Sequence, residues 1–280
     1  MGSARKKNDE RWFDDDESDS PNSALLYEID TLVDRSRAQV QRWTQLPDDL
    51  REKFEISWIY HDCALEGSVL AFHELKAAID KKVLSDVSLM PTYQEIKNHK
   101  AAIDLLREFA ESKKKTPITI NTMRNVHGLL CHATPDEKDA GKYRREIPVN
   151  KLYFHDIEAP DKIAYEMRKL GEWMVSNEAK RTHVIRYAAA VHHRVLQIFP
   201  FSQHAGKVAR LTMNAILVQA GYWPVVIHSI DRQRYYETLR GTTRMITAFV
   251  GDALRYSLLN TLKHVGGRSL TKDDYRASVG

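Results

Sequence analysis

The chain has 280 residues, of which 42% are hydrophobic, so it is long and apolar enough for one large domain with a substantial core. Its formal net charge is only +4, and no dense basic stretch is interleaved with aromatic residues, so nucleic acid is not an expected partner. No segment is apolar over the length of a membrane span, and Cys63 and Cys131 follow no disulfide or metal-ligand spacing. We therefore expect a cytoplasmic protein without a membrane partner.

The N-terminal part of the chain predicts an acidic tail followed by helices. Residues 1–23 are polar and acidic and are expected to be a disordered tail. Apolar residues then recur at helical spacing, and Pro47 is placed to open a second helix. Thr92 starts a capping box that opens a further helix. These signals define an N-terminal helical region over residues 24–115.

The remainder of the chain predicts a helical core over residues 116–265 and a polar C-terminal tail over residues 266–280. The one short segment with weak strand-like alternation contains Ile147 and Val149, and Pro148 between them allows only an edge role. The fold class expected from these patterns is mainly α.

The most informative stretch is a break between two apolar helices at Pro200. The first helix cannot continue through this proline, and the helical period resumes beyond it. The loop therefore lies at a helix N-terminus, where backbone N–H groups and the positive end of the helix dipole favour an anion. Gly206 allows a ligand to approach closely, and Lys207 and Arg210 add full charges. The stretch predicts a site for a phosphate group.

This loop resembles the signature of the Fic family (Fido fold), which is His-Pro-Phe-x-Asp/Glu-Gly-Asn-Gly-Arg-x-x-Arg. Pro200, Phe201, Gly206 and Arg210 match it, and Lys207 keeps the charge of the first arginine. The resemblance implies a helical Fic fold with a small β-hairpin flap and an N-terminal helical region. It also implies a nucleotidyltransferase that takes AMP from ATP and transfers it to a hydroxyl side chain of a target protein (AMPylation).

The residues that carry the family's chemistry are replaced in this sequence. Phe199 stands at the position of the catalytic histidine, and a phenyl ring cannot accept a proton. Gln203 stands at the position of the magnesium-binding carboxylate, and a neutral amide is a poor ligand for Mg²⁺. Ordinary AMP transfer should therefore be impaired. An engineered substitution at Phe199 would not by itself explain this pattern, because His204 and Ala205 also replace the Gly-Asn pair.

A second segment resembles the inhibitory motif of autoinhibited family members, Ser/Thr-x-x-x-Glu-Gly/Asn. Glu66 and Gly67 match, whereas Asp62 stands at the position of the hydroxyl residue. In the family this glutamate pairs with the second arginine of the loop, here Arg210, and competes with phosphate for one guanidinium. The resemblance thus implies that Glu66 restrains the site. Without it, the Glu-Gly pair would be interpreted as an ordinary helix end.

Two further segments extend the resemblance over about residues 46–263. The extended segment with Ile147 and Val149 follows an Ala-Gly-x-Tyr-Arg pattern, and the resemblance implies that it is the flap that holds a target peptide by strand addition. Tyr236 ends an Arg-x-x-Tyr-Tyr pattern that the resemblance places near the nucleotide base, with plain aromatic packing as the alternative.

Three functions fit this altered loop. The first is a pseudoenzyme that still binds ATP, another nucleotide or a phosphorylated small molecule. The second is a rewired transferase in which His204 serves as base, although a solvated loop residue is the simpler interpretation of this histidine. The third is a non-catalytic module that binds a partner protein through the flap or the acidic tail. The sequence does not determine which group is transferred, which protein is the target or whether the chain forms a homo-oligomer.

No metal site is expected from the histidines. His192 and His193 are neighbours on one helix and diverge by about 100° around its axis, so the two side chains cannot readily share a metal with His204.

Overall fold

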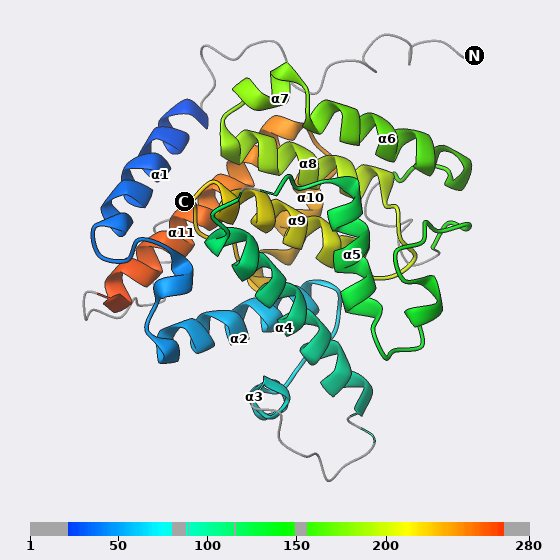
Figure 1. Cartoon of the computed structure of the whole chain (residues 1–280), viewed down its shortest axis with the longest axis horizontal. Helices are drawn as coiled ribbons and strands as arrows, with labels where there is room; N and C mark the ends of the chain where they lie inside the picture. Colours follow the sequence, from blue (N-terminus) through cyan, green and yellow to red (C-terminus); the bar gives the residue numbers. More distant parts are fainter. Residues whose placement is uncertain (1–21, 80–87, 89, 115, 149–155, 266–280) are drawn as a thin grey trace.

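The computed structural model describes residues 22–79, 88, 90–114, 116–148 and 156–265 (Figure 1). Within these ranges the chain forms helices and no β-strand, which confirms the mainly α fold class. The α-helices are α1 (Asn22–Arg37), α2 (Asp48–Leu65), α3 (Phe72–Ile79), α4 (Met90–Glu111), α5 (Ile120–Cys131), α6 (Ile163–Met174), α7 (Asn177–Arg181), α8 (Val184–Ile198), α9 (Ala205–Gln219), α10 (Arg232–Thr238) and α11 (Thr243–Val265). Short 3-10 turns are η1 (Trp43–Gln45), η3 (Glu137–Asp139), η5 (Pro160–Lys162) and η6 (Ser229–Asp231).

Two sequence expectations need correction. The predicted β-hairpin flap is not confirmed, because residues 144–148 form no strand and Val149 lies outside the described residues. Ile147 is exposed, and Pro148 removes a backbone donor that a strand ladder would use. The helix predicted to open at Thr92 begins earlier, at Met90, so the proline at position 91 lies in its first turn, where proline is tolerated.

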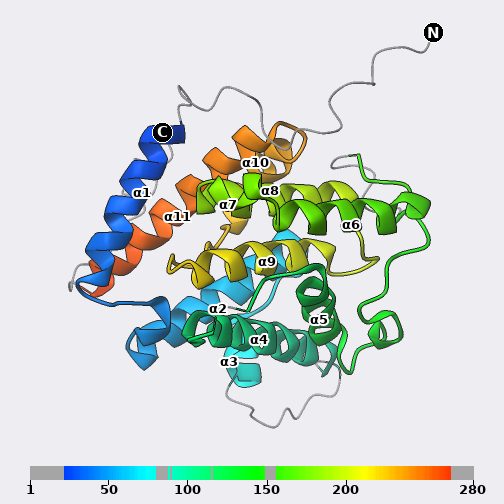
Figure 2. The ribbon, with the colours of Figure 1, turned by 45° about the horizontal axis from the view of Figure 1, so that its top comes forward.

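Helix α9 is the centre of the molecule. Every residue from Ala205 to Val218 is buried, so this helix is enclosed on all sides rather than amphipathic. Figure 2 shows α9 lying between α8 and α4, and α5 also contacts it. A fully enclosed helix places any charged residue on its surface directly inside the protein core.

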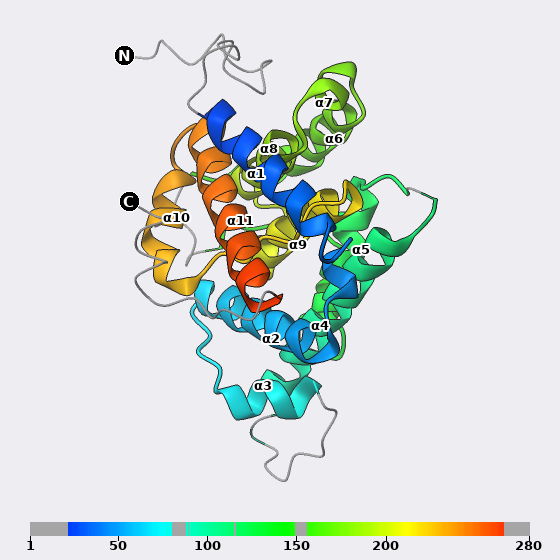
Figure 3. The same cartoon turned by 90° about the vertical axis from the view of Figure 1, so that its left-hand side faces the viewer.

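The N-terminal helices share one hydrophobic core with the later ones. Helix α1 lies along α11 at the other end of the chain, as Figures 1 and 3 both show. Asn22 Nδ2 donates to the carbonyl oxygen of Arg244 at 3.1 Å and fixes the start of this pair. Ile29, Trp58 and Val208 are at most 1% exposed and belong to one cluster. Among the described residues, no helix combines the length and the apolar character needed to cross a membrane.

Arg144 fastens the end of α8 to the segment that follows α5. Its side chain is buried, and its backbone N–H donates to the carbonyl oxygen of Pro200 at 2.9 Å. The side chain of Arg144 donates hydrogen bonds to the carbonyl oxygens of Phe199 (2.6 Å), Glu146 (3.0 Å), Ile198 (3.3 Å) and Glu158. A single guanidinium thus satisfies carbonyl groups that the end of a helix leaves without partners.

We expect Arg144→Ala to lower the free energy of unfolding by about 2–4 kcal/mol, because it leaves several buried carbonyl oxygens unpaired. Urea unfolding monitored by circular dichroism measures the change. The matched control is Arg145→Ala, which removes an exposed neighbour of the same type and should stay within about 0.5 kcal/mol of the parent. Equal losses in both variants would contradict a role specific to Arg144.

Candidate anion-binding site at the start of α9

The loop between α8 and α9 is fixed by aromatic side chains that point into the core. Phe199 ends α8 in the left-handed region (φ 49°) with its ring buried. Phe201 is fully buried and stacks on His127, with ring centroids 4.0 Å apart and planes 8° from parallel. The ring at position 199 is therefore part of the hydrophobic core and offers no polar atom to a ligand.

His204 precedes α9 and also adopts the left-handed region (φ 57°). This is the position at which the Fic signature has glycine, the residue that adopts such angles without strain. A residue with a side chain costs about 1 kcal/mol there. The imidazole is mostly buried, with Nε2 3.9 Å from a carboxylate oxygen of Asp136. Burial and the charge of Lys207 lower the pKa of His204, so its ring is neutral at pH 7.

Arg210 lies one turn into α9 and is held by two carboxylates from α2. Its Nε donates to Asp62 Oδ1, and its Nη2 donates to Glu66 Oε1 at 3.0 Å. The residue is 2% exposed. The contact between Glu66 and Arg210 is the pairing implied by the resemblance to the inhibitory motif.

The carboxylate of Glu66 lies directly over Gly206. A Cβ atom added to this glycine would come within 2.3 Å of Glu66 Oε1 and 3.0 Å of Arg210 Nη1. A side chain here would force Glu66 and Arg210 to shift, so glycine is what allows the acidic group to approach this closely. A negatively charged oxygen at the N-terminus of a helix, beside an arginine, occupies the place that a phosphate oxygen would take.

Lys207, on the same turn as Gly206, is held from α4. Its Nζ donates to Glu95 Oε1, which also lies 3.9 Å from the thiol of Cys63. Burial alone would lower the pKa of Lys207, but the surrounding acidic groups outweigh it and raise the value. Lys207 is thus a permanent cation that is 1% exposed and already paired. The pKa of Cys63 is raised to about 12 by burial, so this thiol is neutral.

The site as a whole contains more carboxylates than cations. Burial alone would raise the pKa of Asp62, but Arg210 and His99 outweigh it and lower the value to about 2. Asp62 is therefore ionised throughout the neutral range. The group contains two positive charges, on Lys207 and Arg210, and three carboxylates: Asp62, Glu66 and Glu95.

The end of α2 is anchored so that Glu66 points at the loop. Gly67 (φ 96°) closes the helix with a Schellman motif, in which the N–H of Ser68 reaches the carbonyl oxygen of Cys63 at 3.0 Å. The carbonyl oxygen of Leu65 accepts hydrogen bonds from the Tyr236 hydroxyl at 3.0 Å and from an Arg232 side chain at 2.9 Å. Tyr236, expected near a nucleotide base, thus lies beside the end of α2. Its contact with a base stays a prediction.

Sequence reasoning missed several residues of this site. Glu95 was part of a capping-box signal, and nothing in its local pattern pointed to Lys207. His99 gave no signal, although its ring is fully buried with Nε2 3.1 Å from Asp62 Oδ2. The only available clue was Asp62 itself, which departs from the hydroxyl residue of the motif. Pairing between distant helices cannot be derived from helical periodicity.

The loop does not offer the ligands that magnesium prefers. Gln203, at the position of the family's carboxylate, is exposed and carries a neutral amide. Within the described ranges no group of three or more His, Cys, Asp or Glu side chains is arranged to hold a metal ion. His192 lies 2.9 Å from the Tyr235 hydroxyl, and His193 lies 3.1 Å from the carbonyl oxygen of Leu239.

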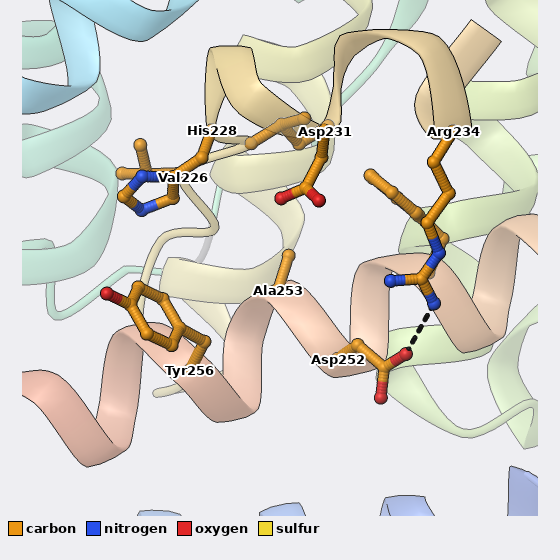
Figure 4. Close-up of a pocket in the computed structure, with 9 residues that line it drawn as sticks. Val226, His228, Asp231, Arg234, Asp252, Ala253 and Tyr256 are labelled. Atoms are coloured by element: carbon orange, nitrogen blue, oxygen red, sulfur yellow. Dashed lines mark hydrogen bonds and ion pairs between the residues drawn. The ribbon is translucent and has the colours of Figure 1, made fainter. Parts of the chain in front are cut away.

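A separate hollow lies between α10, α11 and the segment that precedes η6 (Figure 4). His228 and Tyr256 face it, and Arg234 pairs across it with Asp252 at 2.9 Å. None of the site residues predicted from the sequence lines this hollow. The candidate site therefore stays at the start of α9, where protein carboxylates fill the anion position.

The fold is that of Fic-domain proteins. A Fic-domain-containing signalling protein from Bacteroides thetaiotaomicron aligns with a TM-score of 0.71 at 21% identity, over 88% of this chain and 100% of that one. Fic-1 from C. elegans aligns with a TM-score of 0.73 at 20% identity, over 88% of this chain and 73% of that one. At such identities the similarity defines the fold and leaves the chemistry open.

Sequence comparison identifies the family. Residues 117–217 match the Fic/DOC family. The protein adenylyltransferase Fic of Nematostella vectensis is 32% identical over 218 residues, which cover 71% of this chain and 50% of the relative. The protein of the same name from Drosophila melanogaster is 28% identical over 209 residues, 71% of this chain and 40% of the relative. The chain belongs to the Fic/DOC family and spans about half the length of the curated relatives it matches.

The anchoring of α2 gives a pH dependence. His61 Nδ1 accepts a hydrogen bond from the Ser229 N–H at 3.2 Å, and burial together with His228 lowers the pKa of His61 from 6.5 to about 4. Because the unfolded chain takes up this proton first, the contribution of His61 to stability is complete above pH 6.5 and is lost as the pH falls towards 4.

We expect His61→Asn to lose less free energy of unfolding than the parent between about pH 7.5 and about pH 5, because its side-chain oxygen accepts the same hydrogen bond without titrating. Urea titrations at the two pH values measure this. If the parent and the His61→Asn variant lose the same free energy of unfolding between the two pH values, the charge on His61 has no influence on stability.

Proposed function

We propose that this Fic-family protein binds the phosphate groups of a nucleotide such as ATP at the start of α9, and that it does not carry out ordinary AMP transfer. The observation that carries the proposal is the carboxylate of Glu66, which lies over Gly206 and accepts a hydrogen bond from Arg210 at 3.0 Å. A site that holds one anionic oxygen in this way has the geometry and the donors to hold another.

The residues at the catalytic positions support the absence of transfer. A general base must accept a proton from the attacking hydroxyl, and Phe199 presents a buried phenyl ring at that position. The carboxylate that would hold a magnesium ion is replaced by exposed Gln203. The remaining functional groups, Lys207 and Arg210, can bind and orient a phosphate but cannot move a proton, because both are held as cations.

Binding requires Glu66 to leave the position over Gly206. Its carboxylate and a phosphate oxygen compete for the same edge of the Arg210 guanidinium, so the two cannot be bound at once. Glu66 is the residue that follows the last helical turn of α2. Of the two acidic side chains that pair with Arg210, that of Glu66 is the more exposed, at 17% against 3% for Asp62. The position opens only when this side chain moves away from Gly206 and Arg210.

We expect Glu66→Gly to bind ATP at least about tenfold more tightly than the parent, because a charge-assisted competitor has been removed. Calorimetry in EDTA and in Mg²⁺ measures the affinity, and Glu66→Gln, which keeps the size and loses the charge, should lie between the two. The gain should disappear in Glu66→Gly with Arg210→Ala. If no variant binds ATP, the nucleotide proposal is wrong, and a module that binds a partner protein becomes the better explanation.

A second function, transfer with His204 as base, is favoured by one observation: this imidazole is neutral and lies 3.9 Å from Asp136. We expect Glu66→Gly, incubated with Mg²⁺ and ATP labelled in its α-phosphate, to leave itself and added proteins unlabelled, because no base stands at position 199. Label transfer that His204→Gln abolishes would establish the second function instead.

A further inference from the structure

Asp62 stands where the Fic inhibitory motif has a hydroxyl residue, and its role differs from that of Glu66. The carboxylate is 2% exposed and lies beneath Arg210 rather than over the loop. Its Oδ1 accepts a hydrogen bond from Nε of Arg210, and its backbone carbonyl oxygen lies 3.4 Å from Nη2. A hydroxyl group at this position would leave Arg210 with one fewer negative partner.

The guanidinium of Arg210 presents two different edges to its surroundings. The edge formed by Nε and Nη2 faces Asp62. The edge formed by Nη1 and Nη2 faces Glu66 and Gly206. An incoming anion that displaces Glu66 reaches only the second edge. The contact with Asp62 therefore persists when Glu66 has moved.

His99, from α4, lies beside the other oxygen of this carboxylate. Its ring is fully buried, and Nε2 lies 3.1 Å from Asp62 Oδ2. Burial lowers the pKa of His99, so the ring is neutral and does not cancel the charge of Asp62. The carboxylate lies between a neutral imidazole and a cation, and its charge acts on Arg210.

The charge balance after removal of Glu66 is then zero. Lys207 is paired with Glu95, and Arg210 is paired with Asp62. Two neutral pairs attract a phosphate much less than two free cations would, because the interaction scales with the net charge that the ligand meets.

We propose that Asp62, buried beside His99, is a second counter-ion of Arg210, and that it limits how strongly the loop binds a phosphate group even after Glu66 has been displaced. Asp62 is a positioning residue, because it acts through Arg210 and does not touch the ligand. The inference rests on the proposed function of the loop as a phosphate site, and the experiment separates the two.

The experiment measures the affinity for ATP in EDTA, by calorimetry at fixed ionic strength. Asp62→Asn is introduced into Glu66→Gly, because asparagine keeps an oxygen for Arg210 Nε and removes only the charge. We expect the double variant to bind ATP about tenfold or more tightly than Glu66→Gly alone. In the Arg210→Ala background the same change should alter the affinity by less than about threefold.

Glu95→Gln is the matched control. It removes one carboxylate charge from the same site, but that carboxylate pairs with Lys207. Its effect on ATP affinity should therefore persist in the Arg210→Ala background, whereas the effect of Asp62→Asn should not. A role that is only structural would lower the melting temperature of Asp62→Asn without this dependence on Arg210. Asp62→Ser, which restores the hydroxyl group of the motif, is the second variant should the asparagine variant not fold.

The outcomes are distinct. If Glu66→Gly binds ATP through Arg210 and Asp62→Asn adds nothing, the inference about Asp62 is overturned and the proposed function stands. An equal gain in the presence and absence of Arg210 also overturns it, since Asp62 would then act as a general charge. If neither Glu66→Gly nor the double variant binds ATP, both proposals are overturned.

Discussion

The structure depends on the pairing of two cations inside its core. Lys207 and Arg210 lie on the first turns of α9, a helix that is buried on all sides, and they are 1% and 2% exposed. An unpaired charge at such depth costs several kcal/mol, and removal of one partner of a buried pair is strongly destabilising. The helices around α9 must therefore bring carboxylates to this place, and they do so from α2 (Asp62 and Glu66) and α4 (Glu95).

The need to pair these buried cations affects both the stability of the fold and the proposed binding function. Under the proposed function, the ion pairs that attach α2 and α4 to α9 are also the contacts with which an incoming anion would compete. Glu66 follows the last turn of α2 and its side chain is 17% exposed, whereas Asp62 is enclosed between His99 and Arg210 and its side chain is 3% exposed. Arg210 is thus paired with one partly exposed carboxylate, Glu66, and with one buried carboxylate, Asp62, whose removal would leave a buried charge without this partner.

The loop before α9 is fixed by contacts with the core and with the segment after α5. Phe199 contributes its ring to the core, and Arg144 binds the carbonyl groups at the end of α8. His204 accepts left-handed backbone angles at the glycine position of the Fic signature, at a cost that the surrounding packing compensates. The backbone of this loop is therefore held in place with a phenyl ring at position 199, where the Fic signature has histidine.

The sequence by itself determined the features that depend on neighbours along the chain. Apolar periodicity determined the helices, Pro200 determined the break between α8 and α9, and the order of Gly206, Lys207 and Arg210 after that break determined a cationic helix N-terminus. The match of Glu66 to a motif predicted its contact with Arg210, which the structure contains. The hairpin flap is not confirmed, because residues 144–148 form no strand and Pro148 lacks the backbone donor that a strand ladder uses.

Only the tertiary structure decided which charges meet. Asp62 and Arg210 are 148 residues apart in the chain, and Glu95 and Lys207 are 112 apart, so their pairing follows from the packing of α2 and α4 on α9 and from no local pattern. The same holds for Arg144, whose partners are backbone carbonyl groups of two other segments. Side-chain identity shows that a charge exists, but whether it is buried, paired or available to a ligand is set by the neighbours that folding brings to it.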